Sequence, residues 1–201
     1  MLGPSGLTLD VPTLRTAFAG RFLIFTGNAF KLTFGFYVIT DRLGYSPTEA
    51  VSLVFTATLV FTCGSLVTAT VGGWLSDRLG RRKIFVLVAS LIMGVGLLTL
   101  GFTTTYPQYL VGSLILGMGT GAYMAVDIAL VVRVLPNPDN AAKVLAVFQI
   151  ANSLPQSLAP LIAPLFLTIG GADDNYPAAF TAALVFAVLG ALTVIPIRKV
   201  R

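Results

Sequence analysis

Polar side chains recur at helical spacing inside two stretches that are otherwise strongly apolar. In the first stretch, Arg21, Asn28 and Lys31 are seven and three positions apart, so they share one face of a helix. A lysine in the middle of a membrane span costs about 2.5–3.5 kcal/mol, so it normally faces a bundle interior or a wet cavity. We therefore expect Asn28 and Lys31 to contact a solute. The alternative is a structural lysine that is paired elsewhere or that snorkels outward. Arg21 is expected to snorkel toward the interface, because it lies near the end of its stretch.

The second polar stretch places Gln149, Asn152 and Gln156 in successive turns of an apolar helix. Their amide groups could hydrogen-bond a polar solute in a cavity. They could equally bond to neighbouring helices, where such bonds are worth only about 0.6 kcal/mol each. The candidate solute-binding residues are Asn28, Lys31, Gln149, Asn152 and Gln156.

The densest group of charges runs from Gly73 to Lys83 and reads Gly-Trp-Leu-Ser-Asp-Arg-Leu-Gly-Arg-Arg-Lys. Clustered cations cross a bilayer only at high cost, so we expect a tight cytoplasmic hairpin, with Gly80 allowing the reversal. Asp77 is expected where the preceding helix ends. The hairpin residues expected to hold one conformation of the protein are Gly73, Asp77, Arg78, Gly80, Arg81 and Arg82.

Asp127 lies near one end of another apolar run, and a carboxylate at that depth needs a partner. We expect it to pair with Arg81 or Arg78 of the hairpin and so lock one conformation. The alternative is a hydrated or protonated acid close to the interface.

The composition is that of a helical membrane protein. Of the 201 residues, 56% are hydrophobic and 10% are charged, against about 25% charged in soluble domains. The net charge of +5 does not indicate nucleic acid binding, because the cations cluster in short loops beside apolar runs. The sequence has no histidine, one cysteine (Cys63) and no paired carboxylates within its apolar runs, so we expect no metal, no other cofactor, no intrachain disulfide and no enzymatic activity.

The apolar segments define the elements that position these side chains. Each is near the ~20 residues that a membrane span needs. Residues 1–14 are expected to be a cytoplasmic lead-in, and residues 15–201 form one transmembrane domain. The six expected spans are 15–40, 47–74, 83–103, 107–134, 140–169 and 176–197. Ser46 is expected to cap the second span, and the threonines of that span are expected to bond to carbonyls of their own helix.

The orientation follows from the positive charges of the loops. With a cytoplasmic N-terminus, Arg42 is the one loop cation outside, while the cytoplasmic loops and ends hold all the others. These cytoplasmic cations are Arg15, Arg78, Arg81, Arg82, Lys83, Arg133, Lys143, Arg198, Lys199 and Arg201. This bias places both termini on the cytoplasmic side of the cell membrane.

The third and sixth spans are almost wholly apolar, whereas the other four carry polar side chains. Two inverted three-helix repeats would give this pattern. We therefore expect an all-α membrane protein whose six transmembrane helices form two such repeats, with the third and sixth spans facing lipid.

The stretch from Gly73 to Lys83 also resembles the signature loop between the second and third helices of each half of major facilitator superfamily transporters. Gly73, Asp77, Gly80 and the basic run match that loop at its own spacing. The run Gly117-Met118-Gly119-Thr120-Gly121 is similar to the glycine run of the family's fourth helix, although tight packing is its simpler explanation. Ser113 stands where that helix often carries an arginine, which indicates the C-terminal half of a transporter.

This resemblance implies one six-helix half of a secondary transporter that moves a small solute by alternating access. The alternative is a truncated or accessory membrane protein that transports nothing by itself. The expected partners are the lipid bilayer, a small-molecule solute and a second six-helix half. That half would lie upstream in the same chain, in another copy or in a partner protein.

Overall fold

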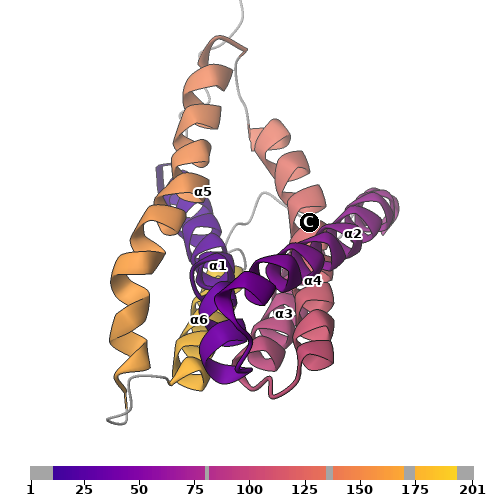
Figure 1. The fold of residues 1–201 in the computed structure, drawn as a ribbon. Coiled ribbons are helices and arrows are strands. Elements are labelled where there is room, and N and C mark those ends of the chain that lie inside the picture. Colours follow the sequence, from indigo (N-terminus) through magenta and orange to yellow (C-terminus); the bar gives the residue numbers. More distant parts are fainter. Residues whose placement is uncertain (1–10, 80–81, 135–137, 170–174, 194–201) are drawn as a thin grey trace, which may run out of the picture.

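The structure, a computed structural model, describes residues 11–79, 82–134, 138–169 and 175–193. These ranges contain six α-helices and no strand (Figure 1). The helices are α1 (Val11–Tyr37), α2 (Pro47–Leu79), α3 (Arg82–Gly101), α4 (Tyr106–Val134), α5 (Pro138–Leu167) and α6 (Tyr176–Leu192), and a short π-helix, η1 (Val38–Arg42), continues α1. The all-helical fold class is confirmed. The second span is longer than predicted, because α2 continues past residue 74 through Asp77 and Arg78 to Leu79.

Among the described residues, four helical segments are long and apolar enough to cross a membrane. They are Phe18–Arg42, Pro47–Ser76, Ile84–Gly101 and Tyr106–Asp127. Helix α6 is apolar as well and has 17 residues. The chain is therefore a multi-pass membrane protein.

The contacts between helices repeat with a two-fold pattern. Helix α4 packs against α2 and α3, and α1 packs in the same way against α5 and α6. Exchanging the first helix with the fourth, the second with the fifth and the third with the sixth turns one set of contacts into the other. The contact between α3 and α6 maps onto itself. Two inverted three-helix repeats produce this arrangement. Helices α2 and α5 lie at opposite edges of the bundle (Figure 1).

Glycines on α4 let two neighbouring helices approach its backbone. A Cβ atom on Gly117 or Gly121 would collide with the backbone carbonyls of Phe61 and Ser65 on α2. On the α3 side, a Cβ on Gly119 would lie 2.6 Å from the amide nitrogen of Met93. The glycine run thus serves close packing, as its small residues indicate.

Small residues also line the contact between α1 and α6. Gly20 lies against Gly190 and Thr193, and Gly27 lies against the carbonyl of Ala183. The buried face of α6 is Tyr176, Ala179, Phe180, Ala183, Ala187, Gly190 and Ala191. With this face of α1 occupied by α6, the face that carries Arg21 and Lys31 is left for α2, α4 and α5.

Side chains of η1 tie the end of α1 to two other helices. Asp41 accepts a hydrogen bond from the hydroxyl of Tyr176 at 2.8 Å, which joins η1 to the start of α6. Arg42 donates to the carbonyl of Gly101 at 2.7 Å, where a cation complements the negative end of the α3 dipole. Gly44 then turns the chain with a φ of 74°, a conformation that glycine adopts readily.

Ser46 and Glu49 cap the start of α2 reciprocally. The backbone N–H of Ser46 donates to Glu49 Oε2 at 3.1 Å, and the backbone N–H of Glu49 donates to Ser46 Oγ at 3.4 Å. This is a capping box, and it confirms the predicted role of Ser46.

Replacing Ser46 with alanine should lower the free energy of unfolding by about 1 kcal/mol, the usual cost of losing an N-cap. Equilibrium unfolding in detergent, followed by circular dichroism, measures the change. Thr48→Ala, an exposed position in the same turn, is the matched control. Equal losses in the two variants would show that the cap contributes nothing.

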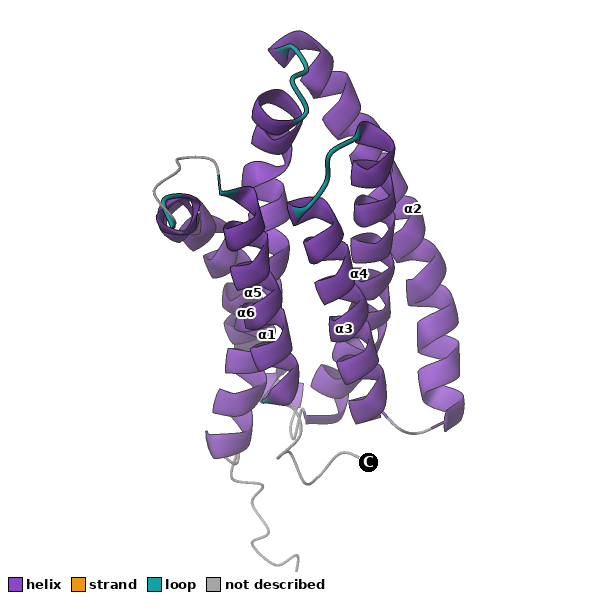
Figure 2. Cartoon of the chain, turned by 90° about the horizontal axis from the view of Figure 1, so that it is seen from below, coloured by secondary structure: helices purple, strands orange, loops and turns teal. Residues whose placement is uncertain are grey.

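Helix α2 exposes side chains along most of its length. Its exposed apolar residues include Val51, Phe55, Leu59, Leu66, Val67, Val71 and Trp74, and Cys63 is exposed among them. The hydroxyls of Thr56, Thr58, Thr62 and Thr70 donate to carbonyls of α2 itself, as predicted. Figure 2 shows α2 at the edge of the bundle. This surface is available to lipid or to another protein.

Candidate functional site

A buried ion pair joins α1 to α4. Nη1 of Arg21 lies 2.6 Å from Oδ2 of Asp127, and the two side chains are exposed by only 10% and 9%. Arg21 lies in the first half of α1 and Asp127 in the second half of α4. Both therefore lie near the end of the bundle at which α2 joins α3, which we call the α2–α3 end.

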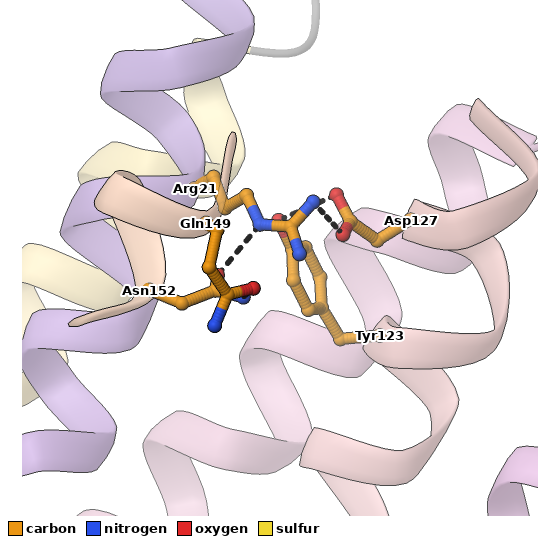
Figure 3. Close-up of polar contacts among 5 residues, drawn as sticks. All are labelled: Arg21, Tyr123, Asp127, Gln149 and Asn152. Carbon is orange, nitrogen blue, oxygen red and sulfur yellow. Dashed lines mark hydrogen bonds and ion pairs between the residues drawn. The ribbon is translucent and has the colours of Figure 1, made fainter. Parts of the chain in front are cut away.

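Two further side chains hydrogen-bond to this pair (Figure 3). The hydroxyl of Tyr123, one turn before Asp127, donates to its Oδ1 at 3.2 Å. Nε of Arg21 donates to Oδ1 of Asn152 on α5 at 2.7 Å. Charge-assisted hydrogen bonds of this kind are roughly twice as strong as neutral ones. We call Arg21, Tyr123, Asp127 and Asn152 the polar junction. It connects α1, α4 and α5, whereas α2 and α3 contribute none of its four residues.

The structure corrects two expectations at this point. Arg21 was expected to snorkel, and that prediction is wrong, because its guanidinium is buried and paired with Asp127. Asp127 was expected to pair with Arg81 or Arg78 of the hairpin; its partner among the described residues is Arg21, and Arg81 lies outside them. Tyr123 was not predicted as a site residue, although a tyrosine one turn from a buried acid is a recognisable signal.

The hairpin residues are described only in part. Gly73 lies near Ala125 of α4, and the guanidinium of Arg78 lies 5.3 Å from the ring centroid of Trp74. Asp77 lies in the last turn of α2, which ends at Leu79, as predicted. Gly80 and Arg81, and the side chains of Asp77 and Arg82, fall outside the described residues.

Lys31 lies ten residues beyond Arg21 on α1, which is about 15 Å along the helix axis. Its side chain is 5% exposed, and its Nζ is 4.7 Å from the ring centroid of Phe61 on α2. An ammonium over an aromatic face is stabilised by the ring quadrupole. Asn28, one turn earlier, has a buried Oδ1 with no hydrogen-bond partner among the described residues.

The five predicted solute contacts form two groups in the structure. Asn28 and Lys31 lie together on α1. On α5, Nδ2 of Asn152 donates to Oε1 of Gln149 at 3.5 Å (Figure 3). Gln156 follows one turn later, and both glutamines are exposed. A polar strip on α5 thus leads from the polar junction to the surface of the bundle.

No group of three potential metal ligands occurs among the described His, Cys, Asp and Glu residues. The arrangement instead combines buried charge, aromatic faces and amides inside apolar helices. Such groups can bind a small polar molecule and can hold helices in one arrangement.

Comparison with known proteins gives a consistent result. A family model described as Major Facilitator Superfamily matches residues 17–201. The chain is 31% identical over 129 residues to the probable 4-methylmuconolactone transporter of Cupriavidus pinatubonensis, covering 62% of this chain and 30% of that protein. It is 29% identical over 108 residues to the uncharacterized MFS-type transporter YfiU of Bacillus subtilis, covering 54% of this chain and 20% of that protein.

The fold resembles that of solved transporters. A bacterial homologue of the human drug peptide transporters PepT1 and PepT2 superimposes with a TM-score of 0.76 at 18% identity, covering 94% of this chain and 42% of that chain. The proton:xylose symporter XylE superimposes with a TM-score of 0.72 at 21% identity, covering 93% and 44%. This chain therefore spans less than half the length of these relatives.

Proposed function

This chain belongs to the Major Facilitator Superfamily, and we propose that it forms one six-helix half of a secondary transporter that moves a small solute by alternating access. The observation that carries the proposal is the set of polar and charged side chains on α1, α4 and α5, held within apolar, membrane-length helices. Buried charges of this kind mark solute and ion pathways in membrane proteins.

The proposed solute contacts are Asn28 and Lys31 of α1 and Gln149, Asn152 and Gln156 of α5. Support comes from their helical spacing and from the packing of α5 against α1. Gln149 and Gln156 are exposed, so their amides are available to a solute or to a second half on this side of the bundle.

A second half completes the proposed pathway. The relatives are more than twice as long as the matched region, and a facilitator-type cavity lies between two halves. We propose that this chain is the C-terminal half, and that the other half lies upstream in the same protein, in another copy or in a partner. The site lies in the cell membrane, with both termini in the cytoplasm.

In the proposed mechanism the two halves rock about the bound solute. The polar junction keeps α1, α4 and α5 together as one unit during this motion, because separating them would leave a charge buried and unpaired. The hairpin from Gly73 to Lys83, at the same end, holds one of the two conformations.

Uptake into proteoliposomes tests the proposal. The solutes to offer are those for which relatives are named, 4-methylmuconolactone, myo-inositol and xylose, together with a dipeptide. We expect uptake of at least one of them, and we expect Gln156→Ala to lower its rate at least tenfold without changing the free energy of unfolding. Thr181→Ala, an exposed position on α6, is the matched control and should transport normally.

Two results would contradict the proposal. A folded protein that takes up none of these solutes, even with its second half present, would favour an accessory role. Normal uptake by Gln156→Ala would remove the α5 strip from the pathway.

A further inference from the structure

Lys31 is a buried cation whose charge is not matched by any described acid. Its Nζ faces the ring of Phe61 at 4.7 Å, and its side chain is 5% exposed. The three acids whose side chains are described are engaged elsewhere. Asp41 accepts from Tyr176, Glu49 accepts from Ser46, and Asp127 pairs with Arg21.

The depth of Lys31 in the membrane limits which groups can neutralise its charge. Arg21 lies at the α2–α3 end, and Lys31 is about 15 Å further along α1. Since the hydrocarbon core is about 30 Å thick, Lys31 lies near its middle. Lipid headgroups are out of reach there, so the counter-charge must come from within the protein assembly or from what it carries.

Two contacts fix the register of α1 against α4 around this position. At one end the hydroxyl of Tyr109 donates to the carbonyl of Gly35 at 3.2 Å, and at the other Arg21 pairs with Asp127. Lys31 is one turn from Gly35 toward the α2–α3 end, and Ser113 is one turn from Tyr109 in the same direction. Helical spacing places Ser113 on the same face of α4 as Tyr109, level with Lys31 on α1.

Ser113 contributes a second unused group. Its side chain is fully buried, and its Oγ has no hydrogen-bond partner among the described residues. The same holds for Oδ1 of Asn28, one turn from Lys31. Buried polar atoms are normally paired, so unpaired ones at the same level of the bundle as an unmatched cation indicate a site for a ligand.

We propose that Lys31 and Ser113 bind the carboxylate of an anionic solute, with Phe61 covering the ammonium when the site is empty. The inference rests on the transport function proposed above and adds the charge of the solute to it. A carboxylate has two oxygens, so one can accept from the ammonium of Lys31 and the other from the hydroxyl of Ser113. An acidic side chain of the second half is the competing partner. It would neutralise the charge of Lys31, but it would not explain why Oγ of Ser113 and Oδ1 of Asn28 are also unpaired.

Thermal unfolding of the purified protein in four sodium salts tests this inference. The salts are chloride, acetate, benzoate and succinate, at equal sodium concentration. We expect at least one carboxylate to raise the melting temperature by about 3 °C over chloride, as a ligand present at several times its Kd would do. Lys31→Gln should abolish this difference and Ser113→Ala should reduce it.

Two control variants separate charge at this site from charge in general and from misfolding. Arg201→Gln removes one positive charge elsewhere and should keep the full response to carboxylate. Lys31→Arg keeps the cation and should retain a response, so the inference stays testable even where Lys31→Gln does not fold.

Several outcomes would overturn the inference. Equal melting temperatures of the unmodified protein in all four salts would do so, and so would a carboxylate response that persists in Lys31→Gln. A Lys31→Gln variant that is destabilised in chloride, with no carboxylate response in the unmodified protein, would identify a protein acid as the partner. Uptake of a neutral solute that survives Lys31→Gln would leave the transport proposal standing while removing this one. Stabilisation by a carboxylate without uptake of any solute would support the carboxylate site and remove the transport proposal.

Discussion

Replacing Arg21 with methionine should lower the free energy of unfolding by about 3–5 kcal/mol, because it leaves the carboxylate of Asp127 buried without its cation. The distance of 2.6 Å and the burial of both side chains make solvent a poor substitute for the lost guanidinium. Oδ1 of Asn152 would also lose its hydrogen-bond donor, Nε of Arg21. Titration with denaturant in detergent micelles, followed by circular dichroism, measures the loss.

A double variant separates the value of the pair from the cost of an orphaned charge. Arg21→Met combined with Asp127→Leu should recover most of the stability, since well-packed apolar side chains often replace a buried ion pair without loss. Arg78→Met is the matched control, because its guanidinium is exposed beside Trp74. If the single variant at Arg21 were as stable as this control, the junction would not hold α1 and α4 together.

Replacing Gly121 with valine should lower the free energy of unfolding by about 3 kcal/mol or more, the upper range for overpacking. The new Cβ would meet the backbone carbonyl of Ser65 and, at 2.6 Å, Oγ1 of Thr68. A backbone carbonyl within α2 cannot move aside unless the whole helix shifts. We therefore expect α2 to separate from α4 and the yield of folded, monodisperse protein to fall sharply in size-exclusion chromatography.

Gly72→Ala is the matched control for this prediction. Its Cβ would lie 3.5 Å from the nearest atom of Ala122, an ordinary contact. Alanine is also the better helix former by about 1 kcal/mol, so this variant should be as stable as the unmodified protein or more so. Normal folding of Gly121→Val would mean that the backbones of α2 and α4 are not in contact at Gly121.

Local features of the sequence predicted most of the fold. Long apolar runs gave the helices, and polar turns with proline and glycine separated them. Ser46 could be identified as a cap because a serine directly before Pro47 is a local pattern that marks the start of a helix. The glycines of α4 could be assigned to packing for the same reason, since small residues on a membrane helix have few other uses.

The partners within the site were harder to predict, because they depend on how distant helices are rotated against each other. Arg21 and Asp127 are more than 100 residues apart. A signal was nevertheless present, because both residues lie toward the same end of the bundle once the alternation of the helices is known. The hairpin obscures this match, because it places several arginines at the same end of the bundle as a single acid. The contact of Lys31 with Phe61 has no comparable signal, because an aromatic residue in an apolar helix has no distinguishing mark.

The position of Cys63 has a practical consequence. It is the one cysteine of the sequence, and its thiol is exposed on α2, the helix at the edge of the bundle. A maleimide dye or a nitroxide can therefore be attached at a single defined point within these 201 residues. Together with a second label on the proposed second half, a label at Cys63 would allow distance changes to be followed in single molecules as the assembly opens and closes.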